Sequence, residues 1–558
     1  MDGCQFSVSV DSTERQRWNR TEVAELLASF ESFVDGSQRE LAVQLEVPRS
    51  TLQHWLARKS SLDLDPEVVR FWESPAGVAF LHRLVLAAHL IFTQVGPCGI
   101  RSLCQFFELS RLDRLVAPSY GAQQHVSVSI QEKINCYAEQ EQARLAKQMP
   151  SKQITVCEDE TFHPQVCLVA IEPVSNFILL EAYANDRTAD TWNEQMAIAL
   201  NGLPVEIVQA TGDECRALAA HARDGLGVPH SPDLFHVQQD LTKATSIALA
   251  SHVRKAEAKL QQEQDKAKKL QIERDACHQQ CPEAVSSFEE RIFQSKIAES
   301  KAEEHQKTCQ DRQEQAQQAI RGVGRDYHPF DLETGKQVDS DALSNKLNSH
   351  FAKIEEMARQ ANLSQKSFDK IEKARRVLPL MISTVAYFWS LVQIKLRTLL
   401  LSMAELAAFH DSLLPSRYLE QAASKATTAE HREQLMMLAD ELLARARDGP
   451  LGQLTPQQWQ IVDATAVDCA QFFQRSSSCV EGRNGQLALR YHSFHQLTQK
   501  KLGTLTALHN YFIQRPDGTT AAERFFEAKP ADLFEWLLDR IPVPARPATR
   551  RNINKRNH

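Results

Sequence analysis

The stretch QITVCEDETFHPQVCLVAIEP, residues 153–173, is where the pattern of the chain changes from helical to mixed α/β. A short apolar run over Ile154, Thr155 and Val156 leads into three consecutive acids, and a second β-type run follows at 166–171. Acids that repel one another at the tip of a buried strand cost stability unless a cation or a catalytic role uses them. The stretch therefore predicts two neighbouring strands and a carboxylate site at the tip of the first.

More strand-type runs alternate with helical segments as far as residue 240. The predicted order is strands at 153–157, 166–171 and 177–183, a helix capped by Thr188, a strand over VEIVQATGDE, a helix, and a fifth strand just before Asp233. Three strands, then helix, strand, helix and strand is the order of an RNase H-like fold. The first and fourth strands are neighbours in such a sheet, so Asp159 and Asp213 at their tips should converge.

Other acids near these tips leave alternatives open. Strand alternation sends Asp159 to one face and both Glu158 and Glu160 to the other, without deciding which face carries the site. Glu214 follows Asp213 and could instead act as an N-terminal acid of the next helix. A third carboxylate from a helix packed on the sheet would complete a cluster that suits Mg²⁺, because magnesium prefers carboxylate oxygens.

The N-terminal segment at 21–58 is predicted to form three short helices. Ser37 and Glu40 form a capping-box pattern at the start of the middle helix. In the third helix the apolar side chains should pack inward, while Arg49, Ser50, Gln53 and His54 face outward. This arrangement resembles a helix-turn-helix whose second helix enters the major groove of DNA. The alternative is an ordinary three-helix bundle.

The rest of the chain is predicted to be mainly helical. Residues 251–320 are rich in Lys, Glu and Gln and indicate an antiparallel hairpin, and VLPLMISTVAYFWSLVQ indicates a buried helix. A helix beginning near Ser477 or Ser478 places Glu481 in its first turn. The expected domains are a helix-turn-helix at 1–60, a helical linker or second DNA-binding domain at 61–150, a catalytic domain split between 151–240 and 476–526, an all-helical insertion at 241–475, and a basic tail at 527–558.

Composition limits the classes of protein that fit. The net charge of −7 argues against a generally basic surface, so DNA contact must come from local patches. The tail PARPATRRNINKRNH is one such patch, or else a disordered, soluble end. The 12 cysteines never form a CxxC pair, which predicts a reduced, cytosolic chain. We expect no signal peptide, and no membrane span because apolar runs are broken by polar residues.

The motifs ITVCEDET, VQATGDE, DLFH and SSCVEGRNGQLALR, in this order, resemble a bacterial insertion-sequence DDE transposase of the RNase H-like superfamily. The resemblance covers roughly 150–240 and 476–526, and it lies in the order of the motifs rather than in any one of them. It implies that Asp159, Asp213 and Glu481 bind Mg²⁺ or Mn²⁺, with two ions in the site. The long helical segment before Glu481 is similar to the insertion of the hAT group.

The resemblance also implies roles for residues near the three acids. Asp233 and His236 match the C/D-x-x-H motif and would orient the active site or contact the scissile strand, although His236 could instead cap the helix that follows. Arg483 and Arg490 are spaced to contact phosphate, or to form a solvated face. Two further residues have competing interpretations. Glu523 could be the third acid in place of Glu481, or it could belong to an ordinary amphipathic helix. Trp389 could stack on a flipped base, or it could belong to the core.

The function implied is that of a transposase. It would bind the terminal inverted repeats of its element through 21–58, cut the DNA, and join it to target DNA. Two ends must be held together, so a homodimer or higher oligomer is expected, in the bacterial cytoplasm at the nucleoid and away from membranes. The alternatives are a catalytically silent DNA-binding regulator derived from a transposase, an RNase H-like nuclease without strand transfer, and a structural coiled-coil protein.

Overall fold

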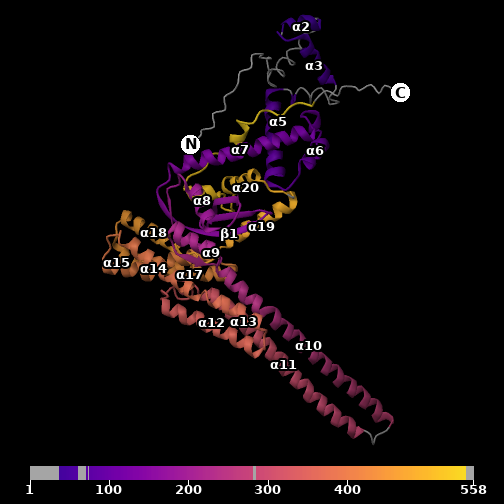
Figure 1. Ribbon diagram of the computed structural model, residues 1–558, viewed down its shortest axis with the longest axis vertical. Coiled ribbons are helices and arrows are strands. Elements are labelled where there is room, and N and C mark those ends of the chain that lie inside the picture. Colours follow the sequence, from indigo (N-terminus) through magenta and orange to yellow (C-terminus); the bar gives the residue numbers. More distant parts are fainter. Residues whose placement is uncertain are drawn as a thin grey trace. The chain divides into compact units, whose positions relative to one another are not determined.

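The computed structural model describes residues 37–44, 46–60, 71–72, 74–280, 285–494 and 496–547. The chain divides into two compact units, the first made of Met1–Met149 with Leu487–His558 and the second of Pro150–Gln486. Most of the described residues are helical, and one mixed sheet of five strands lies in the second unit (Figure 1). The prediction of a small mixed sheet within a mostly helical chain is confirmed.

The first unit consists of helices in the part of the chain that the structure describes. They are α2 (Gln38–Gln44), α3 (Arg49–Ser60), α5 (Pro75–Ala88), α6 (Ile100–Leu109), α7 (Tyr120–Ala146), α20 (Gln499–Tyr511), α21 (Ala521–Phe526) and α22 (Leu533–Leu538), with a π-helical segment at His89–Val95. The predicted capping box is present, since the Ser37 N–H donates to Glu40 and the Glu40 N–H donates to the Ser37 hydroxyl. Leu41, Leu52 and Trp55 form the core between α2 and α3. The helix predicted before Ser37 lies outside the described residues.

The sheet of the second unit has the strand order β3-β2-β1-β4-β5. Its strands are β1 (Lys152–Phe162), β2 (Val166–Glu172), β3 (Phe177–Ala184), β4 (Val205–Gly212) and β5 (His230–Pro232). Strands β1, β2 and β3 pair antiparallel, whereas β4 pairs parallel with both β1 and β5. The first strand is longer than the predicted 153–157, because its acidic second half continues along β2 after β4 has ended.

Helical segments connect β3 to β4 and β4 to β5. Helix α8 (Ala189–Leu200) follows β3 and begins at Thr188, whose hydroxyl accepts from the Thr191 N–H as predicted. Helix α9 (Arg216–Ala220) and a π-helical segment at His221–Leu226 lead from β4 to β5. Trp192 and His221 stack on one another under this cover.

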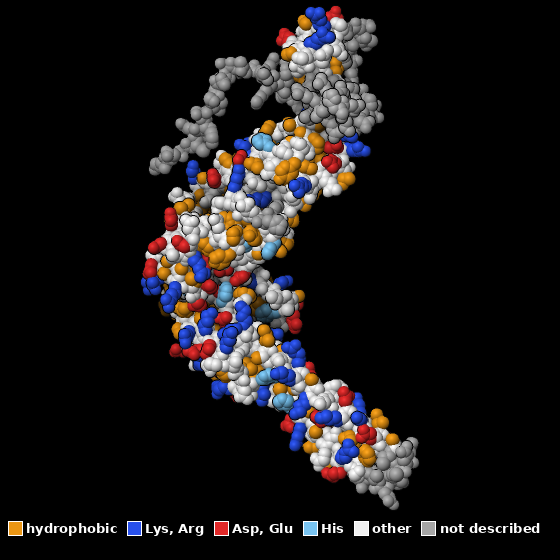
Figure 2. All heavy atoms as spheres, turned by 45° about the vertical axis from the view of Figure 1, so that its right-hand side comes forward, with side chains coloured by type: hydrophobic (Ala, Val, Ile, Leu, Met, Phe, Trp, Pro, Cys, Tyr) orange, Lys and Arg blue, Asp and Glu red, His pale blue; other side chains and the backbone are white. Residues whose placement is uncertain are grey.

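The helical insertion contains α10 (Leu234–Gln280), α11 (Val285–Asp326), α12 (Ser340–Gln360), α13 (Gln365–Arg375), α14 (Leu378–Leu396), α15 (Met403–Ala408), α16 (Leu414–Ser424), α17 (Ala429–Asp448) and α18 (Pro456–Gln471). The helices α10 and α11 form the predicted antiparallel hairpin (Figure 1). Basic and acidic side chains are interspersed on the visible face of this hairpin (Figure 2). A single apolar core joins Val208 of β4 to the insertion helices, so the insertion packs on the sheet.

The insertion core also includes the connector between α11 and α12. Tyr327 is fully buried, and the His328 Nδ1 lies 2.5 Å from the Tyr418 hydroxyl. The Arg475 guanidinium donates to the carbonyl of Tyr327 and to that of Gly324. These contacts give the Tyr327-His328 pair a structural role, because they fix the connector against α16 and the chain that leads to the next helix.

Two helical stretches among the described residues pass a membrane-span test of length and composition, Pro75–Val95 and Gln365–Leu396. About half of each is buried inside the protein, 50% and 44% of the most apolar window. Core helices of a soluble protein have this character, so the expectation of a soluble chain is consistent with the fold.

Candidate functional site

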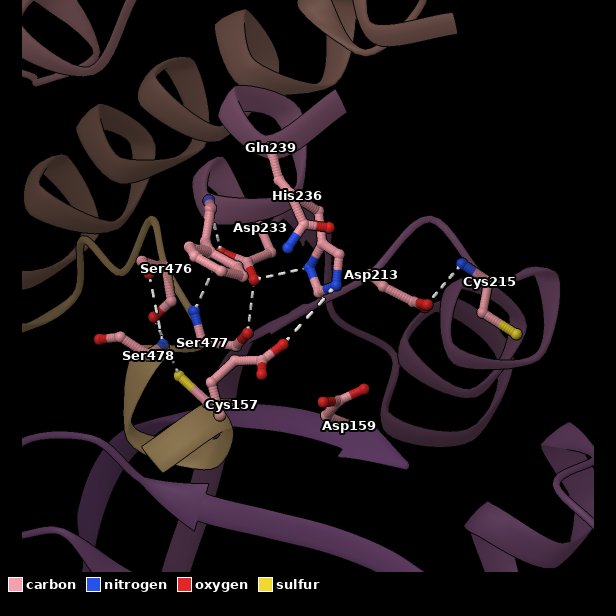
Figure 3. Close-up of polar contacts among 12 residues, drawn as sticks. Cys157, Asp159, Asp213, Cys215, Asp233, His236, Gln239, Ser476, Ser477 and Ser478 are labelled. Atoms are coloured by element: carbon pink, nitrogen blue, oxygen red, sulfur yellow. Dashed lines mark hydrogen bonds and ion pairs between the residues drawn. The ribbon is translucent and has the colours of Figure 1, made fainter. Parts of the chain in front are cut away.

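Asp159 and Asp213 lie beside each other where β1 and β4 run parallel. The parallel register ends where Cys157 pairs with Thr211, and Asp159 and Asp213 each follow two residues later, so both lie at the same end of this pair of strands. Neighbouring strands are about 5 Å apart, which is close enough for two carboxylates to share a cation. Figure 3 shows the two side chains at this end of the strands, with the Asp213 carboxylate accepting from the Cys215 N–H at 2.9 Å.

The neighbouring acids occupy the opposite face of β1, as strand alternation predicts. Glu158 is fully buried, and its carboxylate lies 3.3 Å from the His221 Nε2. Glu160 accepts from the Arg187 guanidinium and from the Trp192 indole N–H. Both glutamates therefore contact side chains of the segments that cover that face of the sheet. Asp159 is the acid of this strand that lies on the face of the site.

Asp159 titrates far from its ordinary range. Burial, followed by the negative charges of Glu481 and Asp213, raises the pKa of Asp159 to about 7, and the hydrogen bond from the Glu160 N–H offsets only part of this. The Asn484 amide donates to Asp159 Oδ2 at 2.8 Å. After burial, the raised pKa reflects the repulsion of Asp159 by the charges of Glu481 and Asp213.

We expect the Asp159→Asn substitution to stabilise the protein at alkaline pH. Because an unfolded aspartate titrates near pH 3.9, the folded chain holds an extra proton between about pH 4 and pH 7, and stability falls as pH rises through this window. The penalty at pH 8 is at most about 4 kcal/mol, since each pKa unit corresponds to about 1.4 kcal/mol.

The melting midpoint of Asp159→Asn should exceed that of the wild type at pH 8 and match it at pH 4, by differential scanning fluorimetry. Mg²⁺ should raise the midpoint of the wild type at pH 8 more than that of the variant. A variant that melts below the wild type at pH 8 would contradict the expectation.

Glu481 is brought to this site by α19 (Ser478–Phe494), which begins where the sequence predicts. The Glu481 N–H donates to the Ser477 carbonyl, so Glu481 lies in the first turn of the helix. Its carboxylate lies 3.7 Å from the His236 Nε2. Among the described residues no three His, Cys, Asp or Glu side chains are arranged closely enough to hold a metal ion together. Metal binding by all three acids would therefore require the Glu481 side chain to turn from His236.

Asp233 connects the long helix α10 to the start of α19. Its fully buried carboxylate accepts from the His236 ring at 2.8 Å, from the Ser477 hydroxyl at 2.6 Å and from the Phe235 N–H at 2.9 Å (Figure 3). Burial alone would raise the pKa of Asp233, but these hydrogen bonds hold it below its ordinary value. The bond to Asp233 in turn raises the pKa of His236. The D-x-x-H motif thus combines helix capping with positioning of Glu481.

The structure corrects the expectation that Arg483 contacts phosphate. Its guanidinium is 6% exposed and forms two hydrogen bonds of 2.7 Å with the buried carboxylate of Glu181 on β3. Arg490 is half-buried and donates to the Val95 carbonyl, which also directs it into the protein. Neither arginine presents a solvated face for DNA.

The predicted DNA-reading residues lie on the first turns of α3. Arg49, Ser50 and Gln53 are exposed, while the side chain of His54 lies outside the described residues.

The positions of Glu523 and Trp389 decide between the two interpretations that the sequence allows for each. Glu523 lies on α21 in the first unit, and Trp389 packs edge-to-face on Phe330 with its indole N–H donating to the Val338 carbonyl. Trp389 is therefore part of the insertion core.

Sequence reasoning missed two features of the site. Phe235, which lies between Asp233 and His236 in the sequence, is 44% exposed beside the His236 ring. Asn484 and Ser477 were not assigned roles, although both bond directly to site carboxylates. The serine run before Glu481 was the available signal, because serine is a favoured helix N-cap.

Comparison with known protein families finds a match over the C-terminal part of the chain. A family of unknown function (DUF6399) matches residues 409–553, from the later part of the insertion through α19 and past the last described residue, 547. The match includes Glu481 but none of the sheet, so Asp159 and Asp213 lie outside it. No curated protein matches this chain, and neither does any solved structure.

Proposed function

We propose that the protein is a DDE-type DNA transposase whose catalytic domain has an RNase H-like sheet interrupted by the helical insertion. The observation that carries the proposal is that Asp159 and Asp213 each follow the last pair of the parallel strands β1 and β4, at one end of the sheet, where their charges interact. Further support comes from the strand order and from α19, which adds Glu481 from a distant part of the sequence.

The donor set suits a hard divalent cation. Asp159, Asp213 and Glu481 would hold Mg²⁺ or Mn²⁺ through carboxylate oxygens. The pKa of Asp159 is raised by burial and then by the charges of Glu481 and Asp213, and a bound cation would relieve that repulsion. When bound, such ions supply an activated water and stabilise the charge that develops at phosphorus. Asn484 holds the Asp159 carboxylate in place, while Asp233 holds both His236 and the first turn of α19.

His236 would act as a positioning group for Glu481. Its Nδ1 is bonded to Asp233, so its Nε2 faces the Glu481 carboxylate at 3.7 Å. Because the pKa of His236 is raised, a positive imidazolium persists to higher pH than in a free histidine and attracts Glu481. The ring would therefore hold the third acid near the site until a cation replaces it.

DNA binding is proposed for the α2–α3 pair, with Arg49, Ser50 and Gln53 on the exposed face of α3. The target would be the terminal inverted repeats of the protein's own element. Pairing of two ends calls for a homodimer or higher oligomer.

The proposal is tested by incubating the full chain with duplex DNA from the flanks of its coding region, in Mg²⁺ or Mn²⁺. Nicks at the element ends and joined products on sequencing gels would support a transposase. Nicks without joined products would support a nuclease without strand transfer. Binding of the same DNA with no cleavage in either metal would contradict the catalytic proposal and favour a silent regulator.

A further inference from the structure

The face of α10 that begins at the carboxylate site carries a lysine two turns further along. His236 and Gln239 lie near the start of α10, and Figure 3 shows their side chains next to each other. The Lys243 ammonium donates a hydrogen bond of 2.5 Å to the Gln239 amide oxygen. Residues three and four apart share a helix face, so Lys243 continues the face on which His236 meets Glu481. It lies about 10 Å from His236 along the helix axis.

Helix α13 packs against this part of the insertion hairpin and adds more positive charge (Figure 1). The Lys373 ammonium lies 2.8 Å from the carboxylate of Asp240, which is one turn beyond His236 on α10. Lys366, Lys370 and Lys373 are spaced four and three residues apart, so they lie on one face of α13. The two helices therefore place lysines next to each other beside the carboxylate site.

The charge of this region differs from that of the whole chain. Residues 365–376 contain five basic and two acidic residues, which gives a local net charge of +3 in a chain whose net charge is −7. Lys373 is 67% exposed. In the part of the chain that the structure describes, the ammonium groups of Lys243, Lys366 and Lys370 pair with no carboxylate. A polyanion could therefore bind three of the four lysines without breaking an ion pair.

We propose that Lys243, Lys366, Lys370 and Lys373 form a DNA-backbone surface, which binds phosphates of duplex DNA close to the bond that the carboxylate site would cut. That this DNA is the substrate rests on the proposed function. Phosphates recur about every 3.4 Å along each strand, so the distance from His236 to Lys243 corresponds to about three base pairs. Lysines beside the site would also offset the repulsion between its acids and the phosphates. Such contacts position DNA without reading its sequence.

The test measures how the full chain binds a short DNA duplex of arbitrary sequence in the absence of divalent metal. Fluorescence anisotropy between about 50 and 200 mM salt gives the slope of log affinity against log salt concentration. Replacing all four lysines with glutamine should make this slope shallower by about 3–4, because each phosphate contact contributes about 0.9. The affinity in about 0.1 M salt should fall by about 10³-fold for the same reason.

Four exposed lysines further along α10 provide a matched control, since their replacement removes the same charge from the same helix. The control lysines begin about 28 Å beyond His236 and are Lys255, Lys259, Lys266 and Lys269. Replacing them with glutamine should change the slope by less than about 1. In the wild type, acetylation followed by mass spectrometry should show that the duplex protects the lysines of the DNA-backbone surface and leaves the control lysines reactive.

Two results would overturn the inference. An equal change of slope in both variants would show that net charge alone explains the binding. An unchanged slope in the first variant would favour an acidic protein as the partner of this surface, and it would leave the proposed function intact where that variant still nicks DNA. The expected slopes in a protein that never nicks DNA would instead support the surface and contradict the catalytic proposal, so the two failures are distinguishable.

Discussion

Replacing Asp159, Asp213 or Glu481 with alanine should each reduce metal-dependent DNA nicking by at least about 10³-fold. Each substitution would remove one carboxylate from a set that holds the cation, and cation stabilisation of the transition state is worth several kcal/mol. A loss of about 4 kcal/mol corresponds to about 10³ in rate. Single-turnover nicking in Mn²⁺, with DNA affinity measured in the absence of metal, separates a loss of chemistry from a loss of binding.

Two acids outside the set serve as matched controls. Glu214 follows Asp213 directly and is exposed, and Glu523 was the rival third acid. Glu523→Gln should retain nicking within about threefold, because surface substitutions away from a site have small effects. Glu214→Gln should also retain nicking, because Glu214 is none of the three assigned acids, even though burial and the charge of Asp213 raise its pKa to about 7. The assignment of the three acids would be wrong if Glu214→Gln abolished nicking while Asp213→Ala did not.

The β-strands and the first contacts of the site could be predicted because they depend on local pattern. The apolar runs locate all three antiparallel strands, and the Thr188 cap and the start of α19 follow from side chains that bond the nearby backbone. The strand β1 was predicted too short because the acids that follow Val156 have low strand propensity. Their pairing with β2 overrides that propensity.

Other features depend on contacts between distant residues, which a single sequence does not display. The domain expected at 476–526 is divided in the structure, since the second unit ends at Gln486 and helices α20 and α21 belong to the first unit. Phe235 lies between two site residues in the sequence, yet it points to solvent because α10 turns that face outward. The raised pKa of Asp159 likewise depends on its burial and, after that, on the charges of Glu481 and Asp213, which lie on distant segments of the chain.

The ion-pair partner of Arg483 could have been predicted from the sequence, although the spacing of the arginines pointed to phosphate instead. Its spacing from Arg490 indicated a phosphate-binding face, but the partner was an acid inside the apolar strand FILLEAYA. The register places Glu181, Val169 and Asp159 in one row across the sheet. Helix α19 crosses this row, with Asn484 bonded to Asp159 and Arg483 bonded to Glu181. A buried acid in a strand calls for a cationic partner.

The Arg483–Glu181 pair should therefore be required for stability rather than for DNA affinity. Arg483→Met would leave the Glu181 carboxylate buried without the guanidinium that neutralises it, and breaking a buried pair in this way costs about 3–5 kcal/mol. Hydrogen exchange of peptides from β3 and from the start of α19 measures this loss of stability locally. A local measurement is needed because a chain of two units does not unfold with a single free energy.

The double variant Arg483→Met with Glu181→Met should be less destabilised than Arg483→Met alone, because neither charge then remains buried. Arg376→Met is the matched control, since the Arg376–Glu372 pair has a similar length of 2.6 Å but side chains that are 74% and 64% exposed. That exposed pair should contribute less than about 1 kcal/mol. Losing a phosphate contact weakens DNA binding and lowers its salt dependence. If Arg483→Met showed this change in DNA binding while its hydrogen exchange stayed unchanged, Arg483 would instead have a phosphate-binding role.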